Sequence, residues 1–151
     1  MDDILSAMGA GAAGSAVVTA ILLVTQVTSG FGVHVFRILA EMVGSDSVLL
    51  GLVLFFGGGM ITWPLLYITL GQYLPGEGAA RGMIFAAVLW LGFAPAFSSG
   101  VLGTGAPAVV QGRAGLLIYL LVTLFAHLIY GAILGAGYLR LGGSEMGSPA
   151  V

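Results

Sequence analysis

The chain has 151 residues, of which 59% are hydrophobic and only 7% are charged. A water-soluble domain carries about 25% charged residues, because its surface must face water. The mean hydropathy of +1.12 therefore indicates an integral membrane protein and excludes ordinary soluble enzymes. Four basic against six acidic residues leave a net charge of -2, which excludes a basic surface for nucleic acid. The absence of cysteine excludes thiolate metal sites and iron–sulfur clusters.

Four apolar runs are long enough to cross a bilayer, which takes roughly 20 helical residues. They cover about residues 4–29, 48–70, 79–97 and 114–139. An even number of spans puts both termini on one side of the membrane. We therefore expect an all-α polytopic protein in which residues 1–151 form a single transmembrane domain, a four-helix bundle in the cell membrane. Two arginines fall on each side, so the positive-inside rule leaves the orientation open.

Residues 32–44, between the first two runs, are too few to span but have two distinct faces. His34, Arg37 and Glu41 follow one another at helical spacing and share one face. The opposite face is apolar and consists of Val35, Phe36, Ile38, Leu39 and Met42. This pattern predicts an amphipathic helix lying in the membrane interface.

The last apolar run carries an ionisable side chain, His127, almost at its midpoint. A single face of this helix holds five residues spaced four apart: Tyr119, Thr123, His127, Gly131 and Gly135. Tyr130 lies beside His127 on the neighbouring row. An ionisable group near the bilayer centre faces the bundle interior by default and indicates a functional site.

The first run has a row of small residues that is typical of close helix contact, namely Ala7, Gly11, Ser15 and Thr19. The first and last runs are antiparallel, which places Gly131 and Gly135 level with the start of this row. We expect the two helices to pack through these small residues. In that arrangement His127 shares a hydrogen bond with Ser15 or Thr19.

Two other roles for His127 stay open at this stage. With Tyr130 it is a candidate for binding a cofactor, a haem or a quinone. With Tyr130 and Thr123 it is a candidate for lining a proton or ion path. A haem held by both histidines of the chain is disfavoured, because His34 lies at interface level, so a second ligand must come from another chain or residue type.

Pro64 stands within the second apolar run. Its ring clashes with the carbonyl of Met60 and it lacks a backbone N–H, which predicts a kink or local widening of the helix. No acidic residue lies inside any span, and this argues against carboxylate chemistry and against a cation-coupled carrier.

Two short segments carry a resemblance to a known family. The glycine- and alanine-rich opening through Thr19, together with the segment from His127 to Gly131 and Gly135 after it, resembles an uncharacterised family of small four-helix membrane proteins of archaea and bacteria. Members look similar to pieces of haem-copper oxidase subunits. The resemblance implies a four-helix fold in a membrane. It implies no established activity and no catalytic residues.

From these observations we expect a non-catalytic accessory subunit of a larger integral membrane complex of electron transfer. Its partners are membrane lipid and other integral subunits, or further copies of itself. One alternative is a small oligomeric channel or carrier with a path lined by His127, Tyr130 and Thr123. Another is a membrane haem or quinone protein that uses His127.

Overall fold

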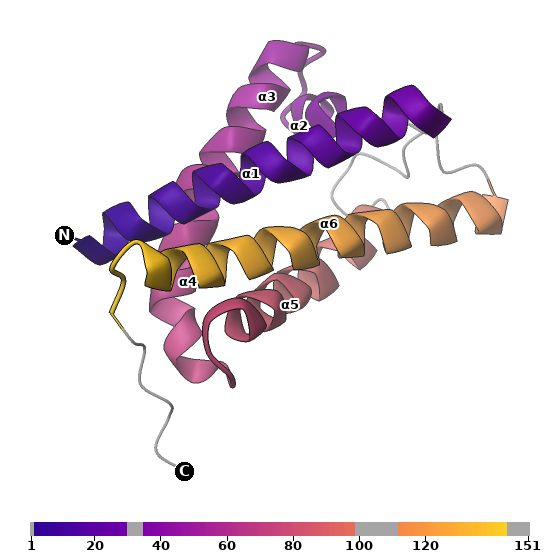
Figure 1. The fold of residues 1–151 in the computed structure, drawn as a ribbon. Coiled ribbons are helices and arrows are strands. Elements are labelled where there is room, and N and C mark those ends of the chain that lie inside the picture. The colour runs from indigo at the N-terminus through magenta and orange to yellow at the C-terminus, as the bar shows by residue number, and fades with distance from the viewer. Residues whose placement is uncertain (1, 30–34, 99–111, 145–151) are drawn as a thin grey trace.

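The computed structural model describes residues 2–29, 35–98 and 112–144, and its regular structure in these ranges is entirely helical (Figure 1). Each helix expected from the sequence is present within a few residues of its expected bounds. The elements are α1 Asp2–Ser29, α2 Val35–Met42, α3 Val48–Gly57, the π-helical turn η1 Gly58–Thr62, α4 Trp63–Leu70, the 3₁₀ turn η2 Gly71–Tyr73, α5 Gly78–Ser98 and α6 Gly112–Arg140.

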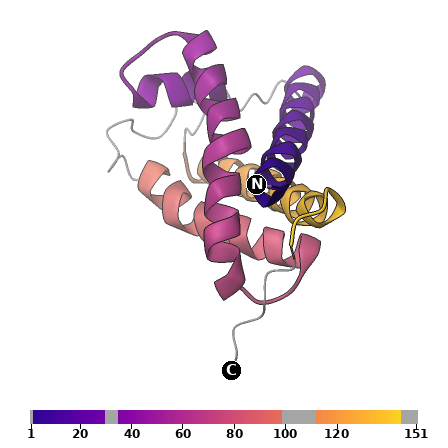
Figure 2. The same cartoon turned by 90° about the vertical axis from the view of Figure 1, so that its left-hand side faces the viewer.

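Three of the helices form a layer that the second apolar run crosses. The long helices α1 and α6 lie side by side, and α5 packs against α6 (Figure 1). The continuous column α3–η1–α4 crosses this layer steeply, and the short helix α2 packs against α3 (Figure 2). The space between the column and the layer is where the candidate site lies.

Local sequence explains where several helices begin and end. The Ser47 hydroxyl accepts a hydrogen bond from the backbone N–H of Leu50 at 3.3 Å and so caps the start of α3. At the end of α6, Gly142 has a φ of 92°, a left-handed conformation that glycine adopts without strain. The Gly143 N–H donates to the Tyr138 carbonyl at 2.9 Å, which completes a Schellman motif.

The start of α1 and the end of α6 are fastened together by polar contacts. The Asp3 carboxylate accepts hydrogen bonds from the Tyr138 hydroxyl at 2.9 Å and from the Ser144 N–H at 2.6 Å. The Ser6 hydroxyl donates to the Leu141 carbonyl at 2.8 Å. The two helices are therefore antiparallel, with the first and last described residues at one end of the molecule.

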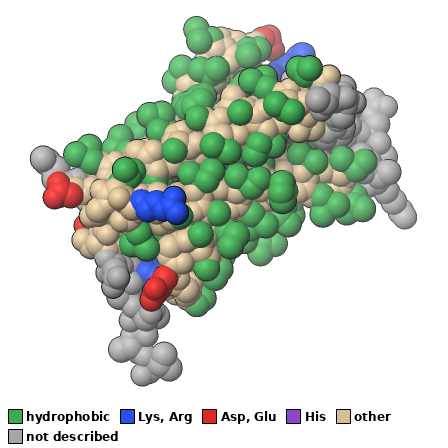
Figure 3. All heavy atoms as spheres, viewed as in Figure 1, with side chains coloured by type: hydrophobic (Ala, Val, Ile, Leu, Met, Phe, Trp, Pro, Cys, Tyr) green, Lys and Arg blue, Asp and Glu red, His purple; other side chains and the backbone are tan. Residues whose placement is uncertain are grey.

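Three stretches are long and apolar enough to cross a bilayer: Asp2–Thr25, Val48–Tyr73 and Leu116–Arg140. The apolar part of α5 whose side chains the structure describes, Gly78–Phe93, is shorter. The all-helical class is therefore confirmed over the described ranges, whereas the fourth span stays a prediction. On the face drawn in Figure 3, apolar side chains cover the helices and the charged ones gather toward the ends.

The glycine row of α6 lies against α5, and the expectation that it packs on α1 is wrong. A Cβ added at Gly131 would collide with the backbone carbonyl of Gly82, and one at Gly135 with that of Gly78. The helix α5 supplies a matching row, since Gly78, Gly82 and Ala86 are four residues apart. Two helix backbones approach here so closely that only glycine fits.

The helix α1 does contact α6, but through the neighbouring rows of both helices. A Cβ at Gly137 would lie 2.9 Å from the Cβ of Ala10, and one at Gly14 would lie 2.8 Å from the Tyr130 ring. In the predicted small row of α1, Ala7, Gly11 and Ser15 are buried and Thr19 is half-buried. This row turns toward the crossing column instead. A Cβ at Gly11, in this row, would collide with the Gly59 carbonyl and the Pro64 ring.

Candidate functional site

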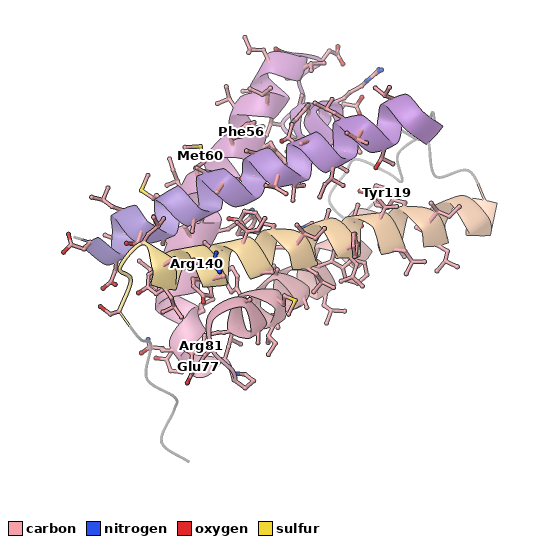
Figure 4. All side chains as sticks on the ribbon, in the orientation of Figure 1. Phe56, Met60, Glu77, Arg81, Tyr119 and Arg140 are labelled. Carbon is pink, nitrogen blue, oxygen red and sulfur yellow. The ribbon has the colours of Figure 1, made fainter. Side chains whose placement is uncertain are left out.

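A cavity of about 410 Å³ lies between the crossing column and the layer, with walls from α1, α2, α3, η1, α4, α5 and α6. Aromatic rings form much of its wall, including both tryptophans of the chain: Phe55, Trp63, Trp90, Phe93, Tyr119 and Tyr130. Tyr119 stands on the side of α6 that faces α1 and α2 (Figure 4). No charged side chain lines the cavity among the residues that the structure describes.

His127 lines this cavity, and one of its two ring nitrogens is already engaged. Its Nδ1 lies 2.8 Å from the backbone carbonyl oxygen of Thr123, one turn earlier on α6. A carbonyl only accepts, so Nδ1 carries the hydrogen, and a neutral ring then has a bare lone pair on Nε2. His127 is exposed and lines the cavity, and Nε2 has no hydrogen-bond partner among the residues that the structure describes.

The expected hydrogen bond from His127 to Ser15 or Thr19 is not formed, so this expectation is also corrected. The Thr19 hydroxyl donates to the carbonyl of Ser15 at 2.8 Å, within α1. His127 satisfies its own donor within α6. The physical reason is the rotation of α6, whose glycine row is turned toward α5 by the close contact with Gly82.

Thr123 helps to fasten α5 to α6 along the cavity wall. The Trp90 indole N–H donates to the Thr123 hydroxyl at 3.1 Å, and that hydroxyl donates in turn to the Tyr119 carbonyl at 2.8 Å. The indole is therefore satisfied, and its ring is held against the cavity. An indole N–H away from water needs an acceptor, but spacing along the sequence could not identify Thr123 as the acceptor for Trp90.

Tyr130 completes the backbone hydrogen bonding of the widened turn before Pro64. Within η1 the Trp63 N–H donates to the Gly58 carbonyl, five residues earlier. The next donor in this series would be residue 64, but proline has no N–H, so the Gly59 carbonyl lacks its helical partner. The Tyr130 hydroxyl donates to that carbonyl at 2.6 Å. The widening expected at Pro64 is thus present, and α6 stabilises it.

Ser15 lines the cavity, and its hydroxyl oxygen is a buried polar atom that nothing in the described structure satisfies. Its side chain is 1% exposed, and its Oγ has no hydrogen-bond partner. It is packed against η1, since a Cβ at Gly59 would collide with the Ser15 hydroxyl. A buried hydroxyl without a partner costs about 1–3 kcal/mol, so this position gains when a ligand supplies one.

The structure thus brings together five residues with polar groups that the sequence singled out, because one cavity is lined by Ser15, Tyr119, Thr123, His127 and Tyr130. The other predicted contact residues do not line it, namely Ala7, Gly11, Thr19, Gly131 and Gly135. His34 lies outside the described residues. Within the described ranges no group of three or more His, Asp or Glu side chains is placed to hold a metal ion.

Comparison with known proteins gives a family and no activity. No curated protein and no solved structure matches the chain. A family model matches residues 1–147, nearly the whole sequence. The chain therefore belongs to DUF6789, a family of unknown function.

Proposed function

We propose that the protein is a non-catalytic membrane subunit that binds a membrane-soluble ring cofactor, of the haem or quinone class, in the cavity beside His127. The observation that carries the proposal is the His127 ring, which has Nδ1 fixed by the Thr123 carbonyl and Nε2 available within an apolar cavity. A backbone carbonyl that fixes the tautomer in this way is the usual support of a ligating histidine.

The shape and lining of the cavity also support a ring cofactor. Its volume of about 410 Å³ falls in the range of small-molecule sites, which are mostly apolar with a few placed polar groups. The aromatic walls suit stacking against a flat ring. The hydroxyls of Thr123 and Tyr130 donate to protein carbonyls, and this favours a binding site over a path for ions.

The membrane arrangement we propose has four spans, with α5 crossing beside α6 as the fourth. Its support is the close packing of the α5 and α6 backbones along the Gly82 and Gly131 rows. The helix α2 lies in the interface of the cell membrane, since Arg37 and Glu41 form an exposed ion pair at 2.8 Å while Ile38 and Ala40 are buried.

The proposed partner is a larger membrane complex of electron transfer. A haem or quinone held by one neutral histidine exchanges electrons with a second redox centre, which the partner subunits supply. Exposed apolar side chains along α1 and α6, among them Leu23, Leu121 and Phe125, offer these subunits and lipid a contact surface.

The test is the recovery of the cofactor with the protein. The wild type and His127→Phe, which keeps a ring but removes Nε2, are purified in mild detergent, with His34→Phe as the matched control. Because His127→Phe loses one hydrogen bond or ligand bond, its cofactor content is expected to be at least tenfold lower than that of the wild type. The control His34→Phe is expected to keep the wild-type content. Absorption spectra detect haem, and mass spectrometry of a solvent extract detects quinone.

Three results would contradict this proposal. Wild-type protein that carries neither haem nor quinone removes the cofactor role, as does equal content in the wild type and His127→Phe. Mass spectrometry of the same preparation also identifies co-purifying chains. A homo-oligomer without other subunits removes the accessory role.

A further inference from the structure

We propose that the cavity selects the reduced, hydroxyl-bearing form of a quinone, with one ring hydroxyl donating to His127 Nε2 and Ser15 Oγ as the second polar contact. This inference rests on the proposed function and names its ligand more narrowly. It depends on three features of the cavity, namely the tautomer of His127, the absence of charge and the unsatisfied hydroxyl of Ser15.

The tautomer of His127 decides whether the cavity prefers the reduced or the oxidised form of the quinone. Since Nδ1–H donates to the Thr123 carbonyl, the neutral ring offers only a lone pair at Nε2. A hydroquinone has O–H groups that donate to this lone pair. A quinone has carbonyl oxygens, which only accept, so it places an acceptor against an acceptor at Nε2. The reduced form therefore gains a hydrogen bond that the oxidised form lacks.

The charge of the lining distinguishes a quinone from a haem. A haem carries two carboxylates, and the described wall of the cavity has no arginine to pair with them. Arg37 is paired with Glu41, and the Arg81 guanidinium donates to the Gly76 carbonyl at 2.7 Å, so both arginines serve other parts of the fold. A hydroquinone is uncharged, which suits a wall that is apolar apart from a few hydroxyls and one imidazole.

Ser15 supplies the second polar contact. Its Oγ is buried and unpartnered on the cavity wall, and it lies beside the Gly59 turn that Tyr130 also contacts. Ser15, Tyr130 and His127 all line this cavity. A hydroxyl both donates and accepts, so Ser15 serves either form of the ring. It therefore contributes affinity, whereas His127 contributes the choice of redox form.

The experiment titrates full-length protein in detergent with duroquinol and duroquinone, under anaerobic conditions, by calorimetry. Wild type is expected to bind duroquinol about tenfold more tightly, which is the value of one hydrogen bond. Preference for the reduced form raises the potential of the bound two-electron couple by about 30 mV for that tenfold ratio. Both tryptophans line the cavity, so their fluorescence reports whether the ligand occupies it.

Matched variants separate the two contacts. His127→Phe is expected to bind both forms with equal affinity, and His127→Gln, whose amide oxygen accepts, to keep part of the preference. Ser15→Ala is expected to weaken both forms about five- to tenfold. Ser6→Ala is the control, because Ser6 is also a buried serine of α1 but donates to the Leu141 carbonyl outside the cavity.

The outcomes also separate this inference from the proposed function. Duroquinone that binds wild type as tightly as duroquinol overturns the inference, as does a preference that persists in His127→Phe. Haemin that binds through His127, shown by a Soret band lost in His127→Phe, overturns the inference but leaves the proposed function standing. If neither duroquinol, duroquinone nor haemin binds, both are wrong.

Discussion

Gly82→Ala is expected to lower the stability of the folded protein by about 3 kcal/mol, the upper part of the range for overpacking. The new Cβ would collide with the backbone carbonyl of Gly131, and a helix backbone cannot move aside as a side chain can. The helices α5 and α6 must therefore separate. Unfolding in detergent, followed by circular dichroism against added denaturing detergent, measures the change.

Gly92→Ala is the matched control on the same helix. A Cβ at Gly92 has no neighbouring atom within 4 Å, so the substitution adds only the helix propensity of alanine, up to about 1 kcal/mol of stabilisation. Equal stability of the two variants would contradict the close contact of α5 with α6. It would also remove the reason why α6 turns His127 away from α1.

Tyr130→Phe is expected to lower stability by about 1–3 kcal/mol, because it leaves the buried Gly59 carbonyl without a donor. The matched control is Tyr73→Phe, since Tyr73 is 68% exposed and its substitution should change little. Thermal unfolding of the two variants in the same detergent measures the difference.

A second substitution tests the cause of the Tyr130→Phe effect. In a Pro64→Ala background residue 64 regains an N–H, which can donate to the Gly59 carbonyl in place of the Tyr130 hydroxyl. The cost of Tyr130→Phe should therefore fall by about 1 kcal/mol in that background, within the usual range of coupling between contacting residues. Strict additivity of the two substitutions would show that the tyrosine hydroxyl does not replace the missing proline donor.

Hydropathy predicted the helices well, because a bilayer requires a long apolar run and the chain has few charges to interrupt it. The second run illustrates this: residues 48–70 were expected, and α3, η1 and α4 together cover the same range. The rotation of each helix was not predictable to the same degree. Glycine and alanine occupy several faces of α1, α5 and α6, so more than one small row was available for each contact.

The sequence also contains a pattern that predicts the observed partner of the α6 glycine row. Gly78, Gly82 and Ala86 repeat at four-residue spacing, as do the small residues of the first run. The row of the first run predicts α1 as the partner of α6, and the row of Gly78, Gly82 and Ala86 predicts α5 equally well.

The candidate site was predictable in part. His127 stood out because an ionisable residue in mid-span is rare, and Tyr130 and Thr123 followed from helical spacing. Ser15 was expected as a hydrogen-bond partner of His127, whereas the structure places both on one cavity without that bond. The contact of Tyr130 with Gly59 joins residues 71 positions apart, and no local pattern encodes it.

Nitrogen-15 NMR of the imidazole ring shows whether His127 presents a bare Nε2 to a ligand inside the cavity. The chain has two histidines, so a His34→Gln sample assigns the signals of His127. We expect a protonated Nδ1 and an unprotonated Nε2, and we expect duroquinol to shift the Nε2 resonance while Nδ1 stays in place. A protonated Nε2, or an Nε2 resonance that neither duroquinol nor haemin moves, would contradict the account.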